Sequence, residues 1–186
     1  GLMALRREHG FAVEQVKRIT VKGPPLINHL VNRPPIQNPS PNYARLCMPY
    51  VLAKVLQHGE IDPTHYDQDA LRDPVTFALS QKVTMVSDGN PDPNTFAPQT
   101  VTVELTNGEC LVKVLSEVLA SPSRRLDKEA RDKKFKSCWA LAKTALETPD
   151  TVMSQLEQLQ TLEDVRPLLA RLTSNNISGE SNAIKR

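Results

Sequence analysis

The sequence is notable first for what it lacks. Aromatic residues make up only 4% of its 186 residues, so a core has to be built mainly of Leu, Val, Ala and Met. It contains no glycine-rich loop of the kind that binds phosphates or dinucleotides. No apolar run approaches the roughly 18 residues needed to span a membrane, and the N-terminus does not have the pattern of a signal peptide. A net charge of +2 is too small to indicate a nucleic-acid partner.

Cysteine is scarce as well. The three cysteines, Cys47, Cys110 and Cys138, form no CxxC pair, which is typical of reduced thiols in a cytoplasmic or, in a eukaryote, a mitochondrial-matrix protein. We expect each of them to be a small buried hydrophobic residue rather than a catalytic thiol.

The sequence contains no cluster of metal ligands. The four histidines show no i, i+4 metal-binding spacing. Oxygen side chains alternate over Asp88–Asn94 as in a calcium loop, but Pro93 stands where the loop needs glycine and Gln99 where it needs glutamate. A solvated loop is therefore the better interpretation.

Proline is concentrated in one stretch, with six prolines in residues 23–42. Such a density is incompatible with a helix interior or a central strand and predicts a stiff loop, which inside a folded unit is often functional. Arg33 lies in this stretch, and its planar guanidinium suits a carboxylate ligand. His29 lies near it and is a second candidate. The alternative is an ordinary surface arginine.

Periodicity and capping signals predict an α+β protein. They indicate a helix end at residues 1–10, a helix from Pro49 to His58 closed by Gly59, and a helix that begins at Asp73-Pro74 with Val75, Ala78 and Leu79 inward. Alternation predicts strands over Lys17–Lys22 and Lys82–Val86.

The clearest local signal is a β-hairpin over Thr100–Thr106 and Glu109–Leu115, joined by Asn107-Gly108. A two-residue type I′ turn at this dipeptide pairs Val103 with Val112 and Val101 with Val114 on one apolar face.

The C-terminal third is predicted to be helical. Asp127 can cap a helix with one apolar side, and the basic residues on it are expected to form a solvated face rather than a phosphate site. Two short helices follow Thr148-Pro149, and the tail from Ser174 is polar. The apolar positions of these three helices are Phe135, Cys138, Trp139, Ala142 and Leu146, then Val152, Leu156 and Leu159, then Val165, Leu168, Leu169 and Leu172.

Several short motifs, in this order and spacing, resemble the C-terminal part of the MmgE/PrpD family, which includes 2-methylcitrate dehydratases, cis-aconitate decarboxylases and an epimerase. The residues that carry the resemblance are Leu5–Gly10, Val31-Asn32-Arg33-Pro34, Ala44–Tyr50, Gly59 with Ile61, Arg72-Asp73-Pro74, Asn107-Gly108 and Lys134-Phe135. In the third motif Leu46 and Cys47 replace the family's aromatic residue and serine.

The resemblance implies a small antiparallel-sheet lid with helices, plus C-terminal helices that belong to a larger all-α domain. Residues 1–11 are then the end of a helix from that domain, 12–122 the lid, 123–173 its closing helices and 174–186 a polar tail. The family's catalytic lysine and histidines are expected upstream of this sequence, so no catalytic residue is assigned here.

The implied function is that of a cofactor-independent lyase acting on a di- or tricarboxylic acid, similar to 2-methylcitrate dehydratase. Its partners are a small carboxylic-acid substrate, the remaining helical domain and a second copy in a homodimer. The implied substrate-binding residues are Arg33, Asn32 and His29. Two alternatives remain open: a stand-alone binding or oligomerisation module without catalysis, and a decarboxylase or epimerase of the same family.

Overall fold

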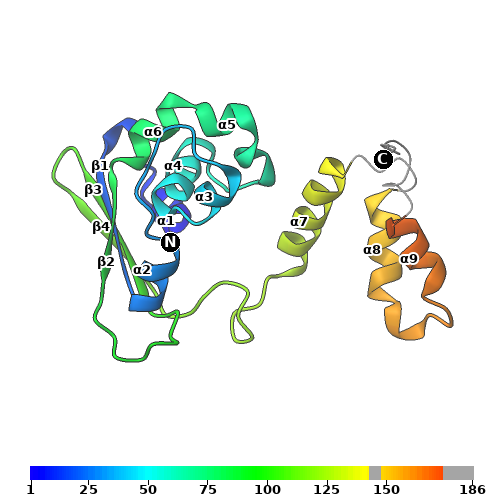
Figure 1. The fold of residues 1–186 in the computed structure, drawn as a ribbon. Helices are drawn as coiled ribbons and strands as arrows, with labels where there is room; N and C mark the ends of the chain where they lie inside the picture. Colours follow the sequence, from blue (N-terminus) through cyan, green and yellow to red (C-terminus); the bar gives the residue numbers. More distant parts are fainter. Residues whose placement is uncertain (143–147, 174–186) are drawn as a thin grey trace, which may run out of the picture. The chain divides into compact units, whose positions relative to one another are not determined.

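The computed structural model describes residues 1–142 and 148–173, with side chains up to residue 170 (Figure 1). Leu146, Leu172 and the predicted polar tail lie outside these described residues and side chains. The chain divides into two compact units, the first comprising Gly1–Arg125 and the second beginning at Leu126. Each unit is described by itself.

The first unit contains a four-stranded sheet and most of the helices. In chain order its elements are α1 (Leu2–His9), η1 (Val13–Gln15), β1 (Val16–Gly23), α2 (Pro25–Val31), α3 (Pro41–Arg45), α4 (Met48–His58), η2 (Pro63–Tyr66), α5 (Gln68–Arg72), α6 (Pro74–Ser80), β2 (Val83–Ser87), β3 (Gln99–Leu105) and β4 (Cys110–Leu115). The predicted α+β class is confirmed, and so are the predicted helices that end at Gly10 and Gly59.

The sheet is mixed rather than purely antiparallel. Its strand order is β2-β1-β3-β4, and β1 pairs parallel with β2 but antiparallel with β3. A parallel pair needs a long crossover, usually helical, and residues 24–82 supply it with five α-helices. The antiparallel prediction was wrong on this point because only the folded crossover decides the direction of β2.

The predicted loop over residues 23–42 is partly helical. Pro24 is the N-cap and Pro25 the first residue of α2, and Pro41 occupies the first turn of α3. Proline is compatible with the first helical turn, where its missing N–H would have no intrahelical partner. Only residues 32–40 between the two helices are irregular, apart from a single β-bridge at Asn32.

The hairpin is present, but its register differs by one residue from the prediction. Leu105 N–H donates to Glu109 O at 2.8 Å, so three residues form the loop, and Gly108 adopts the left-handed conformation at φ 89°. This is the three-residue type rather than a type I′ turn. Leu111 is consequently 5% exposed, whereas Val112 is 56% exposed on the opposite face.

The core of the first unit lies between the sheet and the helices on one of its faces (Figure 1). It is aliphatic as predicted, with Phe11 as its aromatic member, and Val16, Ile19 and Val103 are fully buried on the sheet side. Leu5 of α1 and Leu56 of α4 face them. The core therefore fixes α4, the helix on which the candidate site is built.

The inward face of α6 differs from the prediction. Leu79 is buried, but Val75 and Ala78 are exposed, and Thr76 and Ser80 are buried instead. Thr76 faces inward because its hydroxyl forms hydrogen bonds inside the unit. Its partners are the side chains of Gln57 of α4 and of Asp73, the N-cap of α6.

The second unit contains α7 (Lys128–Leu141), α8 (Pro149–Glu157), η3 (Leu159–Thr161) and α9 (Arg166–Thr173). Asp127 caps α7, as predicted, and Thr148 caps α8. The Phe135 and Trp139 rings stack with centroids 5.6 Å apart. Val152 and Leu168 are its buried hydrophobic residues among the described side chains.

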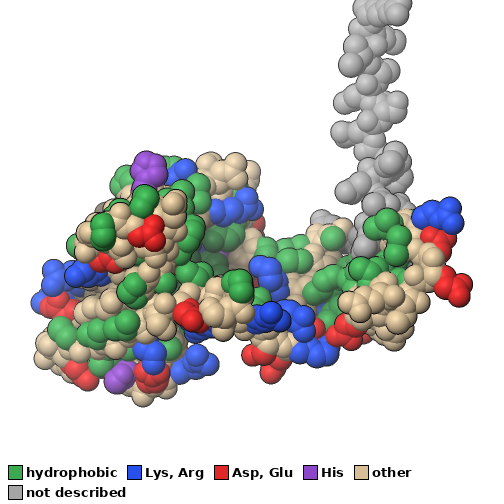
Figure 2. All heavy atoms as spheres, turned by 90° about the horizontal axis from the view of Figure 1, so that it is seen from below, with side chains coloured by type: hydrophobic (Ala, Val, Ile, Leu, Met, Phe, Trp, Pro, Cys, Tyr) green, Lys and Arg blue, Asp and Glu red, His purple; other side chains and the backbone are tan. Residues whose placement is uncertain are grey.

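The basic residues of α7 are exposed, as expected for a solvated face, and Lys128 and Lys136 pair with acidic residues. Lys128 contacts Asp132 and Glu157, and Lys136 contacts Asp150 at 2.6 Å. On the face drawn in Figure 2, charges of both signs are interspersed with hydrophobic side chains. None of the described helices is long and apolar enough to cross a membrane.

Candidate functional site

Arg33 stands immediately after α2, at the start of the irregular segment 32–40. Asn32 is the C-cap of α2, and its N–H donates to Asn28 O at 3.1 Å. The Arg33 guanidinium lies over the ring of Tyr43 of α3, with 5.2 Å between its central carbon and the ring centroid. Among the described residues it makes no ion pair with a carboxylate, so its hydrogen-bond donors are available to a ligand.

The backbone around Arg33 is tied to the α3–α4 junction. The Tyr43 hydroxyl donates to Pro34 O at 2.8 Å, and the Cys47 thiol donates to Arg33 O at 3.2 Å. Asn32 and Cys47 also form an isolated antiparallel bridge. Burial raises the pKa of the Cys47 thiol, although the Tyr50 backbone N–H and the Arg33 charge oppose the shift, so the thiol remains a proton donor.

The three predicted substrate-binding residues do not share one environment. Asn32 and Arg33 are adjacent at the end of α2, where Arg33 is partly buried and Asn32 exposed. The sequence predicted that His29 lies in a loop. In the structure it lies on the exposed last turn of α2.

A narrow pocket lies between the irregular segment and the helices behind it. It has room for about one water molecule. Its walls come from the segment, from the α3–α4 junction and from α5–α6, and include Pro35, Tyr43, Cys47, Tyr50 and Asp73. The two residues that anchor the Arg33 backbone therefore also line this pocket.

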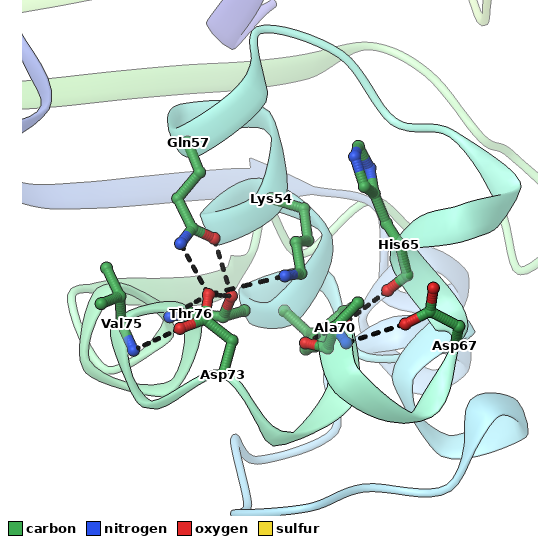
Figure 3. A network of polar contacts seen from close by, with 9 residues as sticks. Lys54, Gln57, His65, Asp67, Ala70, Asp73, Val75 and Thr76 are labelled. Carbon is green, nitrogen blue, oxygen red and sulfur yellow. Dashed lines mark hydrogen bonds and ion pairs between the residues drawn. The ribbon is translucent and has the colours of Figure 1, made fainter.

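Asp73 is part of the pocket wall and is the centre of the network of polar contacts drawn in Figure 3. It caps α6 by accepting from the Val75 and Thr76 N–H groups, and it also accepts from Gln57 Nε2 at 2.8 Å and from the Thr76 hydroxyl at 2.6 Å. Partial burial raises the pKa of Asp73, but the hydrogen bonds from Thr76, Gln57 and Val75 and the charge of Lys54 outweigh it and hold that pKa well below its usual range.

Lys54 is a buried lysine behind Asp73, with 2% of its surface exposed. Its Nζ lies 3.7 Å from Asp73 Oδ2 and 5.8 Å from the Tyr50 ring centroid. Burial lowers the pKa of Lys54, and Asp73 opposes the shift. The sequence reasoning missed this residue; the signal was a single lysine inside the apolar run Val51–Leu56.

Tyr50 and His65 connect this network to η2. The Tyr50 hydroxyl donates to the carbonyls of His65 and Ala70, and burial raises its pKa, so the phenol stays neutral. The His65 ring stacks on His58 at 4.5 Å, and its Nδ1 accepts from Asp62 N–H. Burial lowers the pKa of His65, and the charges of His58 and Lys54 add to the effect.

The family model of the MmgE/PrpD C-terminal domain matches residues 1–158 of this chain. The chain belongs to the MmgE/PrpD family. Among the curated proteins, none matches it significantly. The hydrogen bond from Cys47 to Arg33 O joins two of the motifs, Val31-Asn32-Arg33-Pro34 and Ala44–Tyr50.

In this MmgE/PrpD protein the Cys47 thiol is a buried hydrogen-bond donor. The prediction that all three cysteines are buried holds for Cys47 but is wrong for Cys110 and Cys138, which are exposed. The shifted hairpin register places Cys110 on the outer side of β4, and Cys138 lies on an exposed side of α7.

The calcium-like string forms a loop in which side-chain oxygen atoms accept backbone hydrogen bonds within the loop. Asp88, Asn90 and Asp92 each accept, through Oδ1, the backbone N–H two residues further on, at 2.9 Å. No group of three or more potential ligands among the described side chains is arranged to hold a metal ion.

Proposed function

We propose that this chain is the lid-containing C-terminal part of a MmgE/PrpD-type lyase that acts on a di- or tricarboxylic acid, similar to 2-methylcitrate dehydratase. The observation that supports the proposal most strongly is the environment of the Arg33 side chain. Its guanidinium is held over an aromatic ring, has no carboxylate partner among the described residues, and stands on a proline-stiffened segment. Such a group binds a carboxylate with little loss of side-chain entropy.

In this proposal Arg33 binds one carboxylate of the substrate through two parallel hydrogen bonds. Asn32 adds an amide donor at the same place, and His29 lines the edge of the site from the last turn of α2. The guanidinium then stabilises the charge that develops when a proton next to the carboxylate is removed. Asp73 stays ionised, but the Lys54 ammonium 3.7 Å away compensates its charge and four donors bind its oxygen atoms, which reduces the repulsion of an acid by the neighbouring pocket wall.

The proton-transferring groups belong, in the same proposal, to the family's helical domain, against which the second unit packs. The protein works as a homodimer and uses no organic cofactor. Closure of the first unit over the substrate excludes water and completes the site.

The experiment is steady-state kinetics of the whole enzyme with 2-methylcitrate, citrate and cis-aconitate at fixed ionic strength. We expect Arg33→Ala to lower kcat/KM by about tenfold to a hundredfold, the loss of one charge-assisted contact. Arg33→Lys should recover only part of this, because lysine cannot form the bidentate pair.

The matched control is Arg18→Ala, which removes an exposed arginine paired with Glu104 on the sheet. It should leave kcat/KM within about twofold of the wild type, since exposed ion pairs contribute little. Wild-type kinetics in Arg33→Ala would contradict the proposed role and favour a surface arginine.

A further inference from the structure

The segment that carries Arg33 has no backbone N–H donor at the two positions that follow this residue. Pro34 and Pro35 have no N–H, so this part of the chain offers mainly carbonyls for anchoring. Two of those carbonyls, of Arg33 and Pro34, accept from side chains that stand four residues apart at the α3–α4 junction. The anchoring donors are therefore supplied by Tyr43 and Cys47.

Tyr43 contacts the segment with two different parts of its side chain. Its hydroxyl holds the backbone at Pro34 O, and its ring lies under the guanidinium of Arg33. Cys47 fixes the carbonyl of Arg33 itself and bridges Asn32 through the backbone. Tyr43 and Cys47, which lie at the α3–α4 junction, thus contact both the side chain and the backbone of Arg33.

We propose that Tyr43 and Cys47 are positioning residues that hold Arg33 in its ligand-binding orientation, Tyr43 by its ring and hydroxyl and Cys47 by its thiol. The proposal rests on the proposed function for its effect on substrate, but the anchoring itself can be measured without substrate. A ring beneath the guanidinium restricts a side chain with many rotamers, which reduces the ordering cost of binding.

The anchoring is tested by the rate at which a maleimide modifies Cys47, quantified by peptide mass spectrometry. Cys47 is buried beneath the segment, so modification requires the segment to open, whereas Cys110 is exposed and serves as the internal control. Tyr43→Phe removes only the hydroxyl. It should increase the Cys47 rate roughly three- to tenfold, the loss of one hydrogen bond, and leave Cys110 unchanged. An unchanged Cys47 rate would overturn the anchoring role of Tyr43.

The effect on substrate is tested by a double-mutant cycle in the whole enzyme. Tyr43→Leu should raise KM roughly three- to tenfold with a smaller change in kcat, because it releases a binding group. In the Arg33→Ala background the same substitution should change KM less than twofold, since the residue that it positions is gone. Equal effects in both backgrounds would overturn the proposal.

Cys47 is tested by comparing two replacements. Cys47→Ser keeps a donor for Arg33 O, whereas Cys47→Ala removes it. We expect Cys47→Ser to stay within about twofold of the wild-type KM and Cys47→Ala to raise KM about threefold to tenfold. Equal KM values in the two variants would exclude a donor role for Cys47.

The two proposals fail in different ways. If Tyr43→Phe opens the segment but Arg33→Ala retains wild-type kinetics, the anchoring stands and the carboxylate-binding function is wrong. If Arg33→Ala loses activity but Tyr43→Phe and Tyr43→Leu change neither labelling nor KM, the function stands and the positioning is wrong.

Discussion

The buried pair of Asp73 and Lys54 is asymmetric, because the two side chains differ in how many other partners they have. Asp73 keeps four hydrogen-bond donors in addition to Lys54, whereas the described contacts of the Lys54 ammonium are Asp73 at 3.7 Å and the Tyr50 ring. Removing the carboxylate therefore leaves a buried charge without compensation, but removing the ammonium leaves a carboxylate that is still well solvated by donors.

We predict that Asp73→Ala lowers the free energy of unfolding by about 3–5 kcal/mol, from the unpaired lysine and the lost α6 cap. Lys54→Met keeps the length of the side chain and should cost no more than about 1 kcal/mol. Urea denaturation of both variants gives the comparison. Equal losses would mean that the ammonium itself stabilises the unit.

The same carboxylate predicts a dependence of stability on pH. Hydrogen bonds and Lys54 hold the pKa of Asp73 well below its usual range, so its stabilising contribution is complete above the unfolded-state pKa of about 3.9. It is lost as pH falls from there toward the depressed folded pKa. We expect Asp73→Asn to flatten the acid branch below about pH 4, measured as urea midpoints from pH 7 downward. An acid branch as steep as that of the wild type would assign it to other groups.

At the scale of elements, the length of the hairpin loop and the buried side of β4 change together. The three-residue loop at Thr106-Asn107-Gly108 shifts β4 by one residue relative to a type I′ turn, and a shift of one residue exchanges the two faces. The observed register places Leu111 in the core and brings Lys113 into contact with Glu8 of α1. A two-residue turn would have buried the smaller Val112 and exposed Leu111.

This register is tested by a pair of neighbouring substitutions. Leu111→Ala should lower the free energy of unfolding by about 2–5 kcal/mol, since it opens a cavity in the core. Val112→Ala, on the exposed face, should stay within about 0.5 kcal/mol of the wild type. Thermal or urea denaturation measures both. The opposite ranking would support the two-residue turn.

At the scale of the whole molecule, few of the apolar side chains described in the second unit are buried. α7 contains no buried residue, and Leu141, Leu159 and Leu169 are each about half exposed. Exposed apolar groups on this scale mark surfaces that pack against a partner. The proposal that these helices pack on a helical domain, or on a second copy, follows from this exposure.

We predict that the 186-residue chain by itself associates at micromolar concentration, observed by sedimentation velocity. Leu159→Gln with Leu169→Gln should shift the distribution toward monomer, because it makes two exposed apolar positions polar. Val75→Gln, at an equally exposed position of α6 in the first unit, is the control and should change nothing. A wild-type chain that remains monomeric and binds no hydrophobic dye would contradict the prediction.

Local signals in the sequence were sufficient for the ends of α1 and α4, the caps at Asp73 and Asp127, the strands and the position of the hairpin, but not for α2, α3 and α5. Each of the predicted features depends on residues within one turn or one strand, as with Gly59 at φ 79° after α4. The family was also readable from the order of the motifs, and the match over residues 1–158 confirms it.

Tertiary structure alone decided what depends on distant contacts. The direction of β2 is set by the crossover through residues 24–82, and the hairpin register by the fit of Leu111 and Lys113 against α1 and the core. The contacts of Tyr43, Cys47 and Arg33, and the pairing of Lys54 with Asp73, join residues 10 to 19 positions apart. No local propensity encodes such pairs, because the energy of a buried polar group depends on which partner the fold places beside it.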